Sequence, residues 1–540
     1  MTNPDWKTVG ETLIDLLEAN DVEVVFGIPG VHTVELYRGL AASRLRHVTP
    51  RHEQGAGFMA DGYARVSGKP GVCLVISGPG LTNIITAMAQ AFEDSIPMLV
   101  ISAVNAKDSL GKGRGELHEL PNQSAMIKTL VKYSYTLVNS NHLQAVIDRA
   151  FVEMGTGRPG PVHIEIPTDI MMQKIAPPVL SKTLPAQPQA NHRLLAKAAA
   201  LCMDSVRPLI LAGGGCRQAE QELARLAMRL DAPVVTTINA RDLLADHDLH
   251  IPASPSLEAV RRLVACSDLV IAIGTQMGPT DYDMYKNGNF PEIAKLIRID
   301  IDEGQLARGP KSALKIASGA QNACRDLAGF LPVSGCRNEG TKRAAETRSI
   351  AFEALDAKLK REIAIVETIG KSLPGCIIVG DSTQLIYAAN LYCTLEKNTR
   401  WFNSATGFGT LGYAPPAAIG ASLAAPERPV VCIVGDGGIQ FSLAELGSAM
   451  DEKTPVIFIV WNNLGYQEIE NHMVASDIEP TGVKPSPPDF QKLAQAYGLG
   501  RAVVQKIAGL PDTLKLAAQN KGPFLIEIDA WSPHSSVLPE

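Results

Sequence analysis

The sequence predicts an α/β protein made of three doubly wound units with parallel sheets. Short apolar runs alternate with helical segments along most of its 540 residues. Such alternation is typical of βαβ units, because strands buried on both faces need continuous apolar side chains. Two polar stretches without periodicity divide the pattern into three segments. The chain length fits three or four domains, since a domain usually holds about 100–200 residues.

Composition narrows the class of protein further. The hydrophobic fraction of 46% and the charged fraction of 20% are ordinary for an α/β protein. A net charge of −6 does not favour a nucleic-acid partner, and no apolar run has the length of a membrane span. The first residues lack the pattern of a signal peptide. Nine cysteines without a CxxC pair favour reduced core thiols in a cytoplasmic protein.

The first segment, residues 1–177, contains a clear alternation of strands and helices. We predict strands at Val22–Phe26, Arg46–Thr49, Gly71–Ser77, Met98–Ala103 and Val162–Ile166. We predict helices near Val9–Asn20, Ala56–Val66 and Leu81–Glu93. The proline-rich stretch Ala176–Asn191 has no periodicity and is interpreted as a linker.

The middle and last segments repeat this pattern. The middle segment, residues 192–331, has strand candidates at Leu209–Ala212, Ala232–Thr236, Leu269–Ile273 and Leu296–Ile301. The last segment, residues 349–540, has them at Cys376–Gly380, Trp401–Asn403, Val430–Val434, Val456–Trp461 and Phe524–Asp529. Between the two segments, Pro332–Arg348 is polar and is predicted to be a second linker.

Two similar strands close the first and the last segments. Gly160–Ile166 reads GPVHIEI, and Gly522–Ile528 reads GPFLIEI. Short apolar strands resemble one another by chance, so this similarity alone is weak. It indicates that the two outer segments share a fold.

The clearest chemical signal lies at the ends of two predicted strands of the last segment. The run Val430–Val434 is followed by Gly-Asp-Gly-Gly, which contains Asp436, and the run Val456–Trp461 is followed by Asn462-Asn463. Parallel strands deliver both polar ends to one edge of the sheet, where carboxylate and amide oxygens suit Mg²⁺. Bare N–H groups of the glycines at a helix start favour an anion. The residues therefore predict a site for a metal-bound diphosphate, and two ordinary strand-end turns are the alternative.

A second informative block, Arg51–Arg65, reads RHEQGAGFMADGYAR. Glu53 lies there between a short predicted strand and a helix rich in small residues. On position alone, such a carboxylate is more often a solvated charge that complements the helix dipole. A catalytic role for Glu53 therefore depends on the surrounding motifs.

Several motifs occur in an order that points to one family. They are FGIPG at Phe26–Gly30, the block at Arg51–Arg65, ISGPGLTN at Ile76–Asn83, PPAAIGA at Pro415–Ala421, and GDGG. Together they resemble the acetolactate synthase branch of thiamine diphosphate (ThDP) enzymes over nearly the whole chain. The resemblance implies a pyrimidine-binding domain at residues 1–177, a central domain at 192–331 and a diphosphate-binding domain at 349–540. It also implies a homodimer or a dimer of dimers, with sites shared between subunits.

The resemblance further implies roles for individual residues. Glu53 matches the catalytic glutamate, which bonds to the aminopyrimidine ring and promotes formation of the C2 ylid. Asp436, Asn463 and the carbonyl of Gly465 match the ligands of Mg²⁺. The residues expected to contact ThDP are Gly30, Ser382, Thr383, Gln384, Gly409, Leu411, Gly437, Gly438 and Tyr466.

Some of these residues have simpler alternatives. Ser382 and Thr383 follow a predicted strand, where such residues are more often plain helix caps. Leu411 matches the apolar residue that supports the bent cofactor, and a core leucine is the alternative.

Three departures from the acetolactate synthase pattern bear on the reaction. Gly274–Asp281 has no arginine for a substrate carboxylate, and His472 lies nearest the place of a usual tryptophan. Pro252–Ser256 replaces a loop that helps to hold FAD, and Gly213–Gly215 is only a fragment of a nucleotide-binding motif. We therefore expect no FAD, and these departures argue against carboligation.

Other motifs are similar to those of 2-ketoarginine (5-guanidino-2-oxopentanoate) decarboxylases. They are FGIPGVHT, SLGKG with LHE, TGFGTLGY and DIEPTGV. The resemblance implies decarboxylation of a 2-oxo acid through a C2 ylid and an enamine, with CO₂ and an aldehyde, 4-guanidinobutanal for that substrate, as products. The alternatives are acetolactate synthase-type carboligation of pyruvate with a second 2-oxo acid, and a non-catalytic homologue that keeps the fold.

A guanidinium-bearing substrate calls for carboxylates near the cofactor. Glu468 is such a candidate, together with Glu119, Asp281 and Glu470, although each is more often a solvated surface charge.

Two histidines are the better polar candidates for substrate contact. His32 and His118 belong to loops that approach the reacting carbon in the family, and either could donate to a substrate carboxylate or protonate the intermediate. A local bond within the loop is an equal alternative. Gln123 is a weaker candidate of the same kind.

Overall fold

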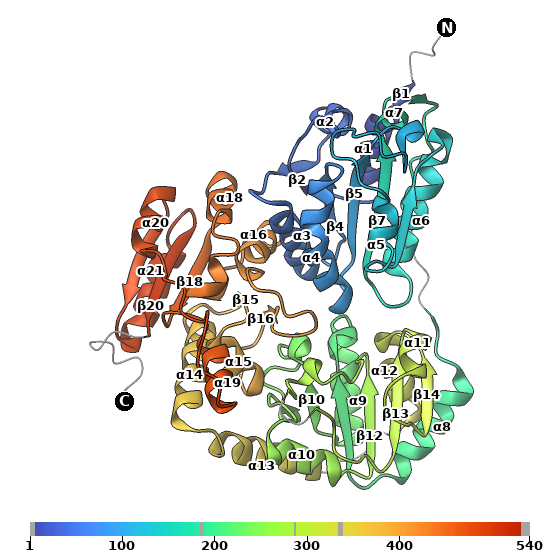
Figure 1. The fold of residues 1–540 in the computed structure, drawn as a ribbon. Helices are drawn as coiled ribbons and strands as arrows, with labels where there is room; N and C mark the ends of the chain where they lie inside the picture. Colours follow the sequence, from blue (N-terminus) through green and yellow to red (C-terminus); the bar gives the residue numbers. More distant parts are fainter. Residues whose placement is uncertain (1–5, 184–187, 286–287, 333–337, 531–540) are drawn as a thin grey trace.

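The computed structural model describes residues 6–183, 188–285, 288–332 and 338–530. It contains three six-stranded sheets, in which every strand pair is parallel. Figure 1 shows them as three units, the first in blue to cyan, the second in green to yellow and the third in orange to red. The predicted fold class, α/β with three doubly wound parallel sheets, is confirmed.

The first unit has the strand order β3-β2-β4-β5-β7-β6. Its strands are β2 (Val24–Gly27), β3 (Arg46–Val48), β4 (Gly71–Val75), β5 (Met98–Val104), β6 (Tyr133–Thr136) and β7 (Pro161–Pro167). Its helices are α1 (Val9–Ala19), α2 (Val34–Ala41), α3 (Glu53–Ser67), α4 (Pro79–Glu93), α5 (Gln123–Ile127), α6 (Leu143–Gly155) and α7 (Thr168–Met171). A small antiparallel pair, β1 (Lys7–Thr8) with β8 (Lys174–Ile175), joins its two ends.

The second unit has the order β11-β10-β9-β12-β13-β14. Its strands are β9 (Pro208–Ala212), β10 (Val234–Thr236), β11 (His250–Ile251), β12 (Leu269–Ile273), β13 (Leu296–Asp300) and β14 (Leu314–Ala317). Its helices are α8 (His192–Asp204), α9 (Glu220–Leu230), α10 (Glu258–Ala265), α11 (Glu303–Ala307) and α12 (Ala320–Phe330).

The third unit has the order β16-β15-β17-β18-β20-β19. Its strands are β15 (Ile377–Gly380), β16 (Arg400–Asn403), β17 (Val430–Gly435), β18 (Val456–Asn462), β19 (Gly500–Val504) and β20 (Phe524–Asp529). Its helices are α14 (Ala357–Ser372), α15 (Gln384–Leu391), α16 (Ala414–Ala424), α17 (Asp436–Ile439), α18 (Glu445–Glu452), α19 (Gln467–Ala475), α20 (Phe490–Tyr497) and α21 (Leu510–Ala518).

The two outer units share one topology. Numbered within each unit, both sheets have the order 2-1-3-4-6-5, whereas the central sheet has 3-2-1-4-5-6. The similar Gly-Pro strands, β7 and β20, are the sixth strand of their units and lie between the fourth and the fifth. The repeated segment therefore marks equivalent positions in two similar folds.

Helices α3 and α16 join the outer units through a shared apolar core. Their backbones approach so closely that only glycine fits at the crossing. A Cβ atom on Gly62 would lie 2.0 Å from the carbonyl oxygen of Ala417, and one on Gly420 would lie 1.9 Å from that of Met59. This packing explains the small residues in the ADGYAR and PPAAIGA motifs.

The two-residue strands β1, β8 and β11 were not predicted. Three longer strands that we did not predict are edge strands of their sheets: β6, β14 and β19. Each is only partly buried, and β19 alternates between exposed and less exposed residues. An edge strand packs on fewer neighbours than a central one, so it does not need the continuous apolar run by which we recognised the others.

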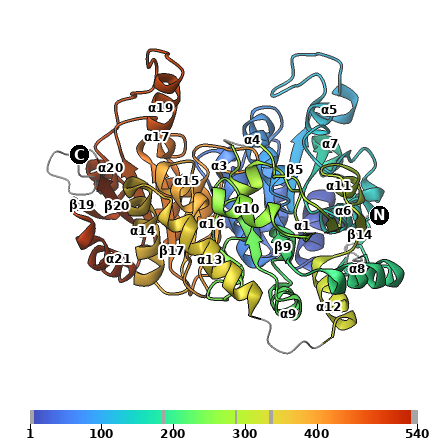
Figure 2. The same ribbon diagram turned by 90° about the horizontal axis from the view of Figure 1, so that it is seen from below.

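The predicted second linker at Pro332–Arg348 is wrong for most of its length. Helix α13 occupies Glu339–Glu353 and packs on α10, and Figure 2, the view from below, shows it between α10 and α14. Only Gly340, Ala344, Thr347 and Ala351 of this helix are buried. Because this narrow stripe consists mostly of small residues, the sequence shows no apolar periodicity that would predict the helix. Residues 333–337 lie outside the described part, as do 184–187 of the first linker, whose described remainder has neither helix nor strand.

Most of the described cysteines are reduced and buried in the core, as predicted. Seven of the eight described cysteines are buried and all eight are free thiols, whereas Cys266 is exposed. Cys336 lies outside the described residues. None of the described helices is both long and apolar enough to cross a membrane.

Candidate active site

The predicted site residues gather at the carboxyl ends of strands in the two outer units. In both units the first strand has the second strand on one side and the third strand on the other. This is the topological switch point, where open α/β sheets bind their ligands. In the third unit the switch point lies between β15 and β17, and in the first unit it lies between β2 and β4.

Three oxygen atoms converge beyond β17 and β18. Asp436 is the first residue of α17, and Asn463 directly follows β18. The side-chain oxygen of Asn463 lies 2.9 Å from Oδ1 of Asp436 and 3.0 Å from the carbonyl oxygen of Gly465. Ligands about 2.0–2.1 Å from an octahedral Mg²⁺ lie about 3 Å from one another when they occupy adjacent positions. The spacing of the three oxygens therefore fits a magnesium ion.

Asp436 has an unused acceptor at this point. Its side chain is almost fully buried, and Oδ2 has no hydrogen-bond partner. Burial raises the pKa of Asp436 to about 6, against the effect of the backbone N–H groups around it. A buried carboxylate that lacks a partner is costly, and a bound cation would relieve this cost. The described residues contain no cluster of three His, Cys, Asp or Glu side chains, so a metal here depends on amide and carbonyl oxygens as well.

The glycines after Asp436 let other groups come close to the start of α17. A Cβ atom on Gly437 would lie 2.5 Å from the ring of Tyr466, and one on Gly438 would lie 3.1 Å from Oδ1 of Asp381. Thr383 is buried beside Gly435. The bare backbone N–H groups at this point suit the diphosphate that the sequence predicts.

A carboxylate that sequence reasoning missed organises the neighbouring loop. Asp381 follows β15, is fully buried, and accepts hydrogen bonds from the backbone N–H groups of Ser382 (2.9 Å), Gly412 (3.3 Å) and Ala414 (3.0 Å). Burial raises its pKa to about 6. Its position at a strand end was visible in the sequence, but two of its partners, Gly412 and Ala414, lie 31 and 33 residues further along the chain.

The loop at 404–412 carries Gly409 and Leu411. Gly409 is exposed with φ +73°, and Leu411 is only partly buried, which does not fit a plain core leucine. Thr410 between them donates from its backbone N (3.3 Å) and its hydroxyl (2.9 Å) to Oε1 of Gln90 on α4. Helix α4 of the first unit therefore holds this loop of the third unit in place through hydrogen bonds.

In the first unit, Glu53 is the first residue of α3. It is 9% exposed, and its Oε2 accepts a hydrogen bond of 2.9 Å from the amide of Asn83. The chain just before Glu53 is held by Glu445 of α18, which accepts from the backbone N of Arg51 (3.0 Å) and of His52 (3.1 Å). Asn83 ends the ISGPGLTN motif and Glu445 begins α18, and only the fold brings them to Glu53 and the backbone before it.

His32 and His118 form a pair near the same edge. Their rings meet edge to face with centroids 5.3 Å apart, and Nδ1 of His32 is hydrogen-bonded to the hydroxyl of Ser77. Burial, with the charge of His118 as a second cause, lowers the pKa of His32, so its neutral form is favoured. Gly30, in the same loop as His32, packs on Ile76.

Gln123 is 4% exposed, and its amide is engaged within the protein. Its Oε1 accepts from the backbone N of Gly78 (3.0 Å), and its Nε2 lies within 3.1 Å of Ser102, Ala103 and Glu165. This geometry holds the turn after β4, beside His118, and leaves the Gln123 amide without a free donor for a substrate.

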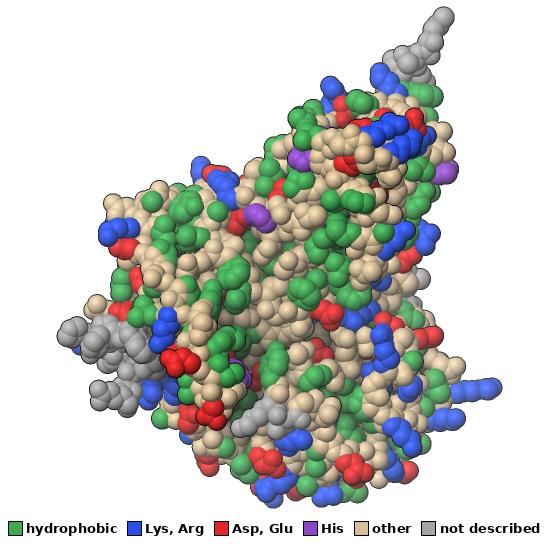
Figure 3. All heavy atoms as spheres, viewed as in Figure 1, with side chains coloured by type: hydrophobic (Ala, Val, Ile, Leu, Met, Phe, Trp, Pro, Cys, Tyr) green, Lys and Arg blue, Asp and Glu red, His purple; other side chains and the backbone are tan. Residues whose placement is uncertain are grey.

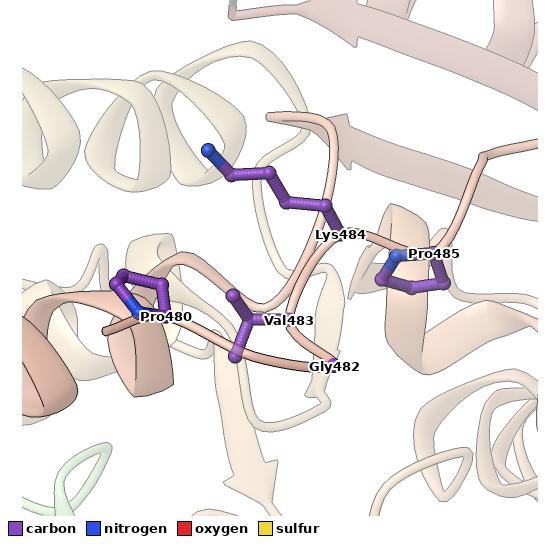
Figure 4. A pocket seen from close by; sticks show the side chains of 5 residues that line it. All are labelled: Pro480, Gly482, Val483, Lys484 and Pro485. Carbon is purple, nitrogen blue, oxygen red and sulfur yellow. The ribbon is translucent and has the colours of Figure 1, made fainter. Parts of the chain in front are cut away.

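Glu468 lies on α19, a helix in which no residue is buried. Its carboxylate is 46% exposed and lies 3.6 Å from Nε2 of His472. The following loop, drawn in Figure 4, lines a surface hollow of about 310 Å³ with Pro480, Gly482, Val483, Lys484 and Pro485. This loop packs beside the predicted metal ligand Gly465, since the carbonyl of Val483 accepts a hydrogen bond of 2.8 Å from the backbone N of Tyr466.

The structure thus brings together two groups, one around Glu53 in the first unit and one around Asp436 in the third. Among the described residues, no hydrogen bond or ion pair joins Glu53 to Asp436 or Asn463 within one chain, although other residues of the two units do bond to each other. Each group alone lacks half of the residues that the sequence predicts for one site.

Models of one family match all three units. The N-terminal TPP binding domain of thiamine pyrophosphate enzymes matches residues 7–126, the central domain of these enzymes matches 195–327, and the C-terminal TPP binding domain matches 381–528. The chain therefore belongs to the thiamine pyrophosphate enzyme family, whose cofactor is the ThDP predicted above.

The similarity to related proteins extends over almost the whole chain. It is 40% identical to the probable 2-ketoarginine decarboxylase AruI of Pseudomonas aeruginosa, over 96% of this chain and 94% of that protein. It is 31% identical to a probable acetolactate synthase large subunit of Methanocaldococcus jannaschii, over 96% and 91%. It is 29% identical to the chloroplastic acetolactate synthase of Arabidopsis thaliana, over 99% and 83%. The protein is therefore a ThDP-dependent enzyme of the 2-oxo acid decarboxylase and acetolactate synthase type.

The glycine run of the central unit has a packing role. A Cβ atom on Gly213 would lie 2.2 Å from the carbonyl oxygen of Gly274, and one on Gly215 would lie 2.8 Å from its Cα. These glycines let two strand-end turns touch, so they do not by themselves indicate a nucleotide site. The expected absence of FAD stays a prediction, which a flavin absorbance spectrum of the purified protein checks.

Proposed function

We propose that this protein decarboxylates a 2-oxo acid with ThDP and Mg²⁺, and that its substrate is 5-guanidino-2-oxopentanoate. The observation that carries the proposal is the 40% identity, over 96% of the chain, to a protein named as a probable 2-ketoarginine decarboxylase. The departures from the acetolactate synthase pattern at Gly274–Asp281, Pro252–Ser256 and His472 support the same choice.

In this proposal the third unit holds the cofactor by its diphosphate end. Asp436, Asn463 and the carbonyl of Gly465 would hold Mg²⁺, which fits their oxygen spacing and the unpartnered Oδ2 of Asp436. The backbone N–H groups of Gly437 and Gly438 would receive the diphosphate, with Ser382 and Thr383 beside them. ThDP, when bound, supplies the carbon nucleophile and the electron sink.

The first unit would supply the acid–base groups. Glu53, kept in place by Asn83, would bond to the aminopyrimidine ring and hold the proton exchanged there. His32 and His118 lie close enough to act as one polar pair toward a substrate carboxylate. In its neutral form, His32 can still donate one N–H hydrogen bond to the substrate carboxylate.

Among the four carboxylates considered for the guanidinium, Glu468 is the one we propose. Glu119 accepts from three backbone N–H groups of its own loop, Asp281 accepts from Gly278, and Glu470 forms an ion pair with Lys484. Glu468 is half-exposed, and among the side-chain ion pairs and hydrogen bonds of the described residues it takes part only in the pair with His472. Its carboxylate therefore stays available to a cationic substrate.

A panel of 2-oxo acids tests the reaction and the substrate. Pyruvate, branched, aromatic and guanidino acids are compared for CO₂ release, with and without added ThDP and Mg²⁺. We expect cofactor-dependent CO₂ release, fastest with the guanidino acid. Formation of acetoin after acidifying the pyruvate reaction would instead favour carboligation, the reaction named for the acetolactate synthase relatives. No CO₂ from any acid would contradict both reactions.

We further propose that the active unit is a homodimer, which pairs the Glu53 group of one chain with the Asp436 group of another. Exposed apolar side chains lie close to both groups. Val31 and Leu117 flank the two histidines, and Phe441 and Leu464 flank the metal ligands. Figure 3 shows hydrophobic side chains spread over the face between the outer units, with most charged side chains toward the edges. Such a surface suits burial against a second copy.

Mixing two inactive variants tests this arrangement. Co-expressed Glu53→Gln and Asp436→Asn chains form mixed dimers in which one of the two shared sites keeps both residues. By counting sites under random pairing, we expect about one quarter of the wild-type activity. Each variant expressed alone is the control. An inactive mixture with normal dimers would show that each site belongs to a single chain.

A further inference from the structure

Two hydrogen-bond donors, the indole of Trp461 and the amide of Asn463, share one side-chain oxygen of Gln384. The indole Nε1 of Trp461 donates to Oε1 of Gln384 at 3.0 Å, and Nδ2 of Asn463 donates to the same oxygen at 2.9 Å. We propose that Gln384 is a positioning residue, which through this double acceptor keeps the oxygen of Asn463 turned toward the cation. The inference rests on the proposed Mg²⁺ site and gives Gln384 a role other than contact with the diphosphate.

The orientation matters because the Asn463 amide has two competing arrangements. If it turned over, Nδ2 would donate to Oδ1 of Asp436 at 2.9 Å and to the carbonyl of Gly465 at 3.0 Å. In the metal-free protein, those two hydrogen bonds would satisfy the amide N–H groups and the two oxygens that they join. They would also occupy two of the three proposed metal ligands and point an N–H donor at the ion. The arrangement with Nδ2 toward Gln384 instead leaves three oxygens facing one another.

Gln384 opposes the turned arrangement because it offers only an oxygen at that point. In the turned amide, the oxygen of Asn463 would face Oε1 of Gln384 at 2.9 Å, with no hydrogen between them. Gln384 cannot turn over in response, because an indole N–H is only a donor and requires an acceptor opposite it. Trp461 is completely buried and Gln384 is 8% exposed, so water cannot readily replace either bond.

The Trp461 indole and the Asn463 amide therefore both donate to one oxygen of Gln384. Trp461 and Asn463 belong to one strand end, and Gln384 begins α15 on the other side of β17. Groups that orient a metal ligand in this way typically change metal affinity about 10–100-fold when they are removed.

Three substitutions separate orientation from packing. Gln384→Met keeps the volume and removes the acceptor, Gln384→Glu keeps an acceptor for both donors, and Trp461→Phe frees the Gln384 amide to turn. Each protein is stripped of metal, saturated with ThDP, and titrated with Mg²⁺ by calorimetry. Melting temperatures of the metal-free proteins are recorded alongside.

We expect Mg²⁺ binding to weaken about 10–100-fold in Gln384→Met, and by a smaller factor in Trp461→Phe. Gln384→Glu is expected to bind Mg²⁺ at least as tightly as the wild type, since its carboxylate accepts from both donors. A merely structural role would weaken binding in proportion to lost melting temperature, and Glu would not rescue it.

Two results would overturn the inference. One is Mg²⁺ affinity in Gln384→Met within about twofold of the wild type, far below the effect of an orienting partner. The other is equal weakening in the Met and Glu variants. Failure of the wild type itself to bind Mg²⁺ would instead refute the proposed metal site, so the two failures are distinguishable.

Discussion

Replacing Glu53 by Gln is expected to slow exchange of the C2 proton of bound ThDP, and CO₂ release with it, by about 10²- to 10⁴-fold, the range for a positioned acid–base group. Gln keeps the shape of the side chain and an oxygen for the Asn83 amide, which donates to Oε2 at 2.9 Å. It removes the carboxyl group that would bond to the aminopyrimidine ring. Binding of ThDP and the melting temperature should change little, because the diphosphate end is held by the third unit.

Proton exchange is measured by acid quench and NMR, at saturating ThDP and Mg²⁺. Glu452→Gln is the matched control, since Glu452 lies on α18 and also reaches the first unit, in an ion pair with the half-exposed Arg46. An exposed pair of this kind contributes at most about 1 kcal/mol, so exchange in this control should equal that of the wild type. Wild-type exchange in Glu53→Gln would rule out the assigned role.

The second large effect concerns Asp436, for which Asn is the closest substitute in shape. We expect Asp436→Asn to lose Mg²⁺ affinity by more than the roughly 100-fold seen when outer partners of a metal site are removed. The reason is that Asn brings an uncharged oxygen and an amide donor into a cluster that otherwise contains only amide and carbonyl oxygens. ThDP should then be lost on dilution or gel filtration.

The metal-free state should respond in the opposite direction. Asp436 is buried, and its Oδ2 has no partner in the part of the chain that the structure describes. Replacing a buried, unsatisfied charge by a neutral group removes an unfavourable term. The metal-free variant should therefore melt at the same temperature as the metal-free wild type or higher, and the stabilisation by Mg²⁺ with ThDP should disappear. A lower melting temperature without metal, with ThDP binding intact, would contradict a metal-ligand role.

Local sequence patterns were sufficient to predict the central strands of the sheets and the polar residues at their ends. Strands such as β17 and β18 are buried on both faces, so they appear as apolar runs, and their polar ends lie at one sheet edge by topology alone. Asp436 and Asn463 could be paired for this reason before any distance was known. The edge strands β6, β14 and β19 and the helix α13 were missed, because little of their surface is buried.

The class of enzyme, the three parallel sheets and the strand ends that carry polar groups could be predicted, because they follow from short-range periodicity and from motifs close together in the chain. Which distant residues support them depends on the three-dimensional packing. Glu445 holds the backbone before Glu53, Gln90 holds Thr410, and Gln384 orients Asn463 across separations of 393, 320 and 79 residues. Such bonds depend on how sheets and helices pack, and that packing leaves no periodic trace in the sequence.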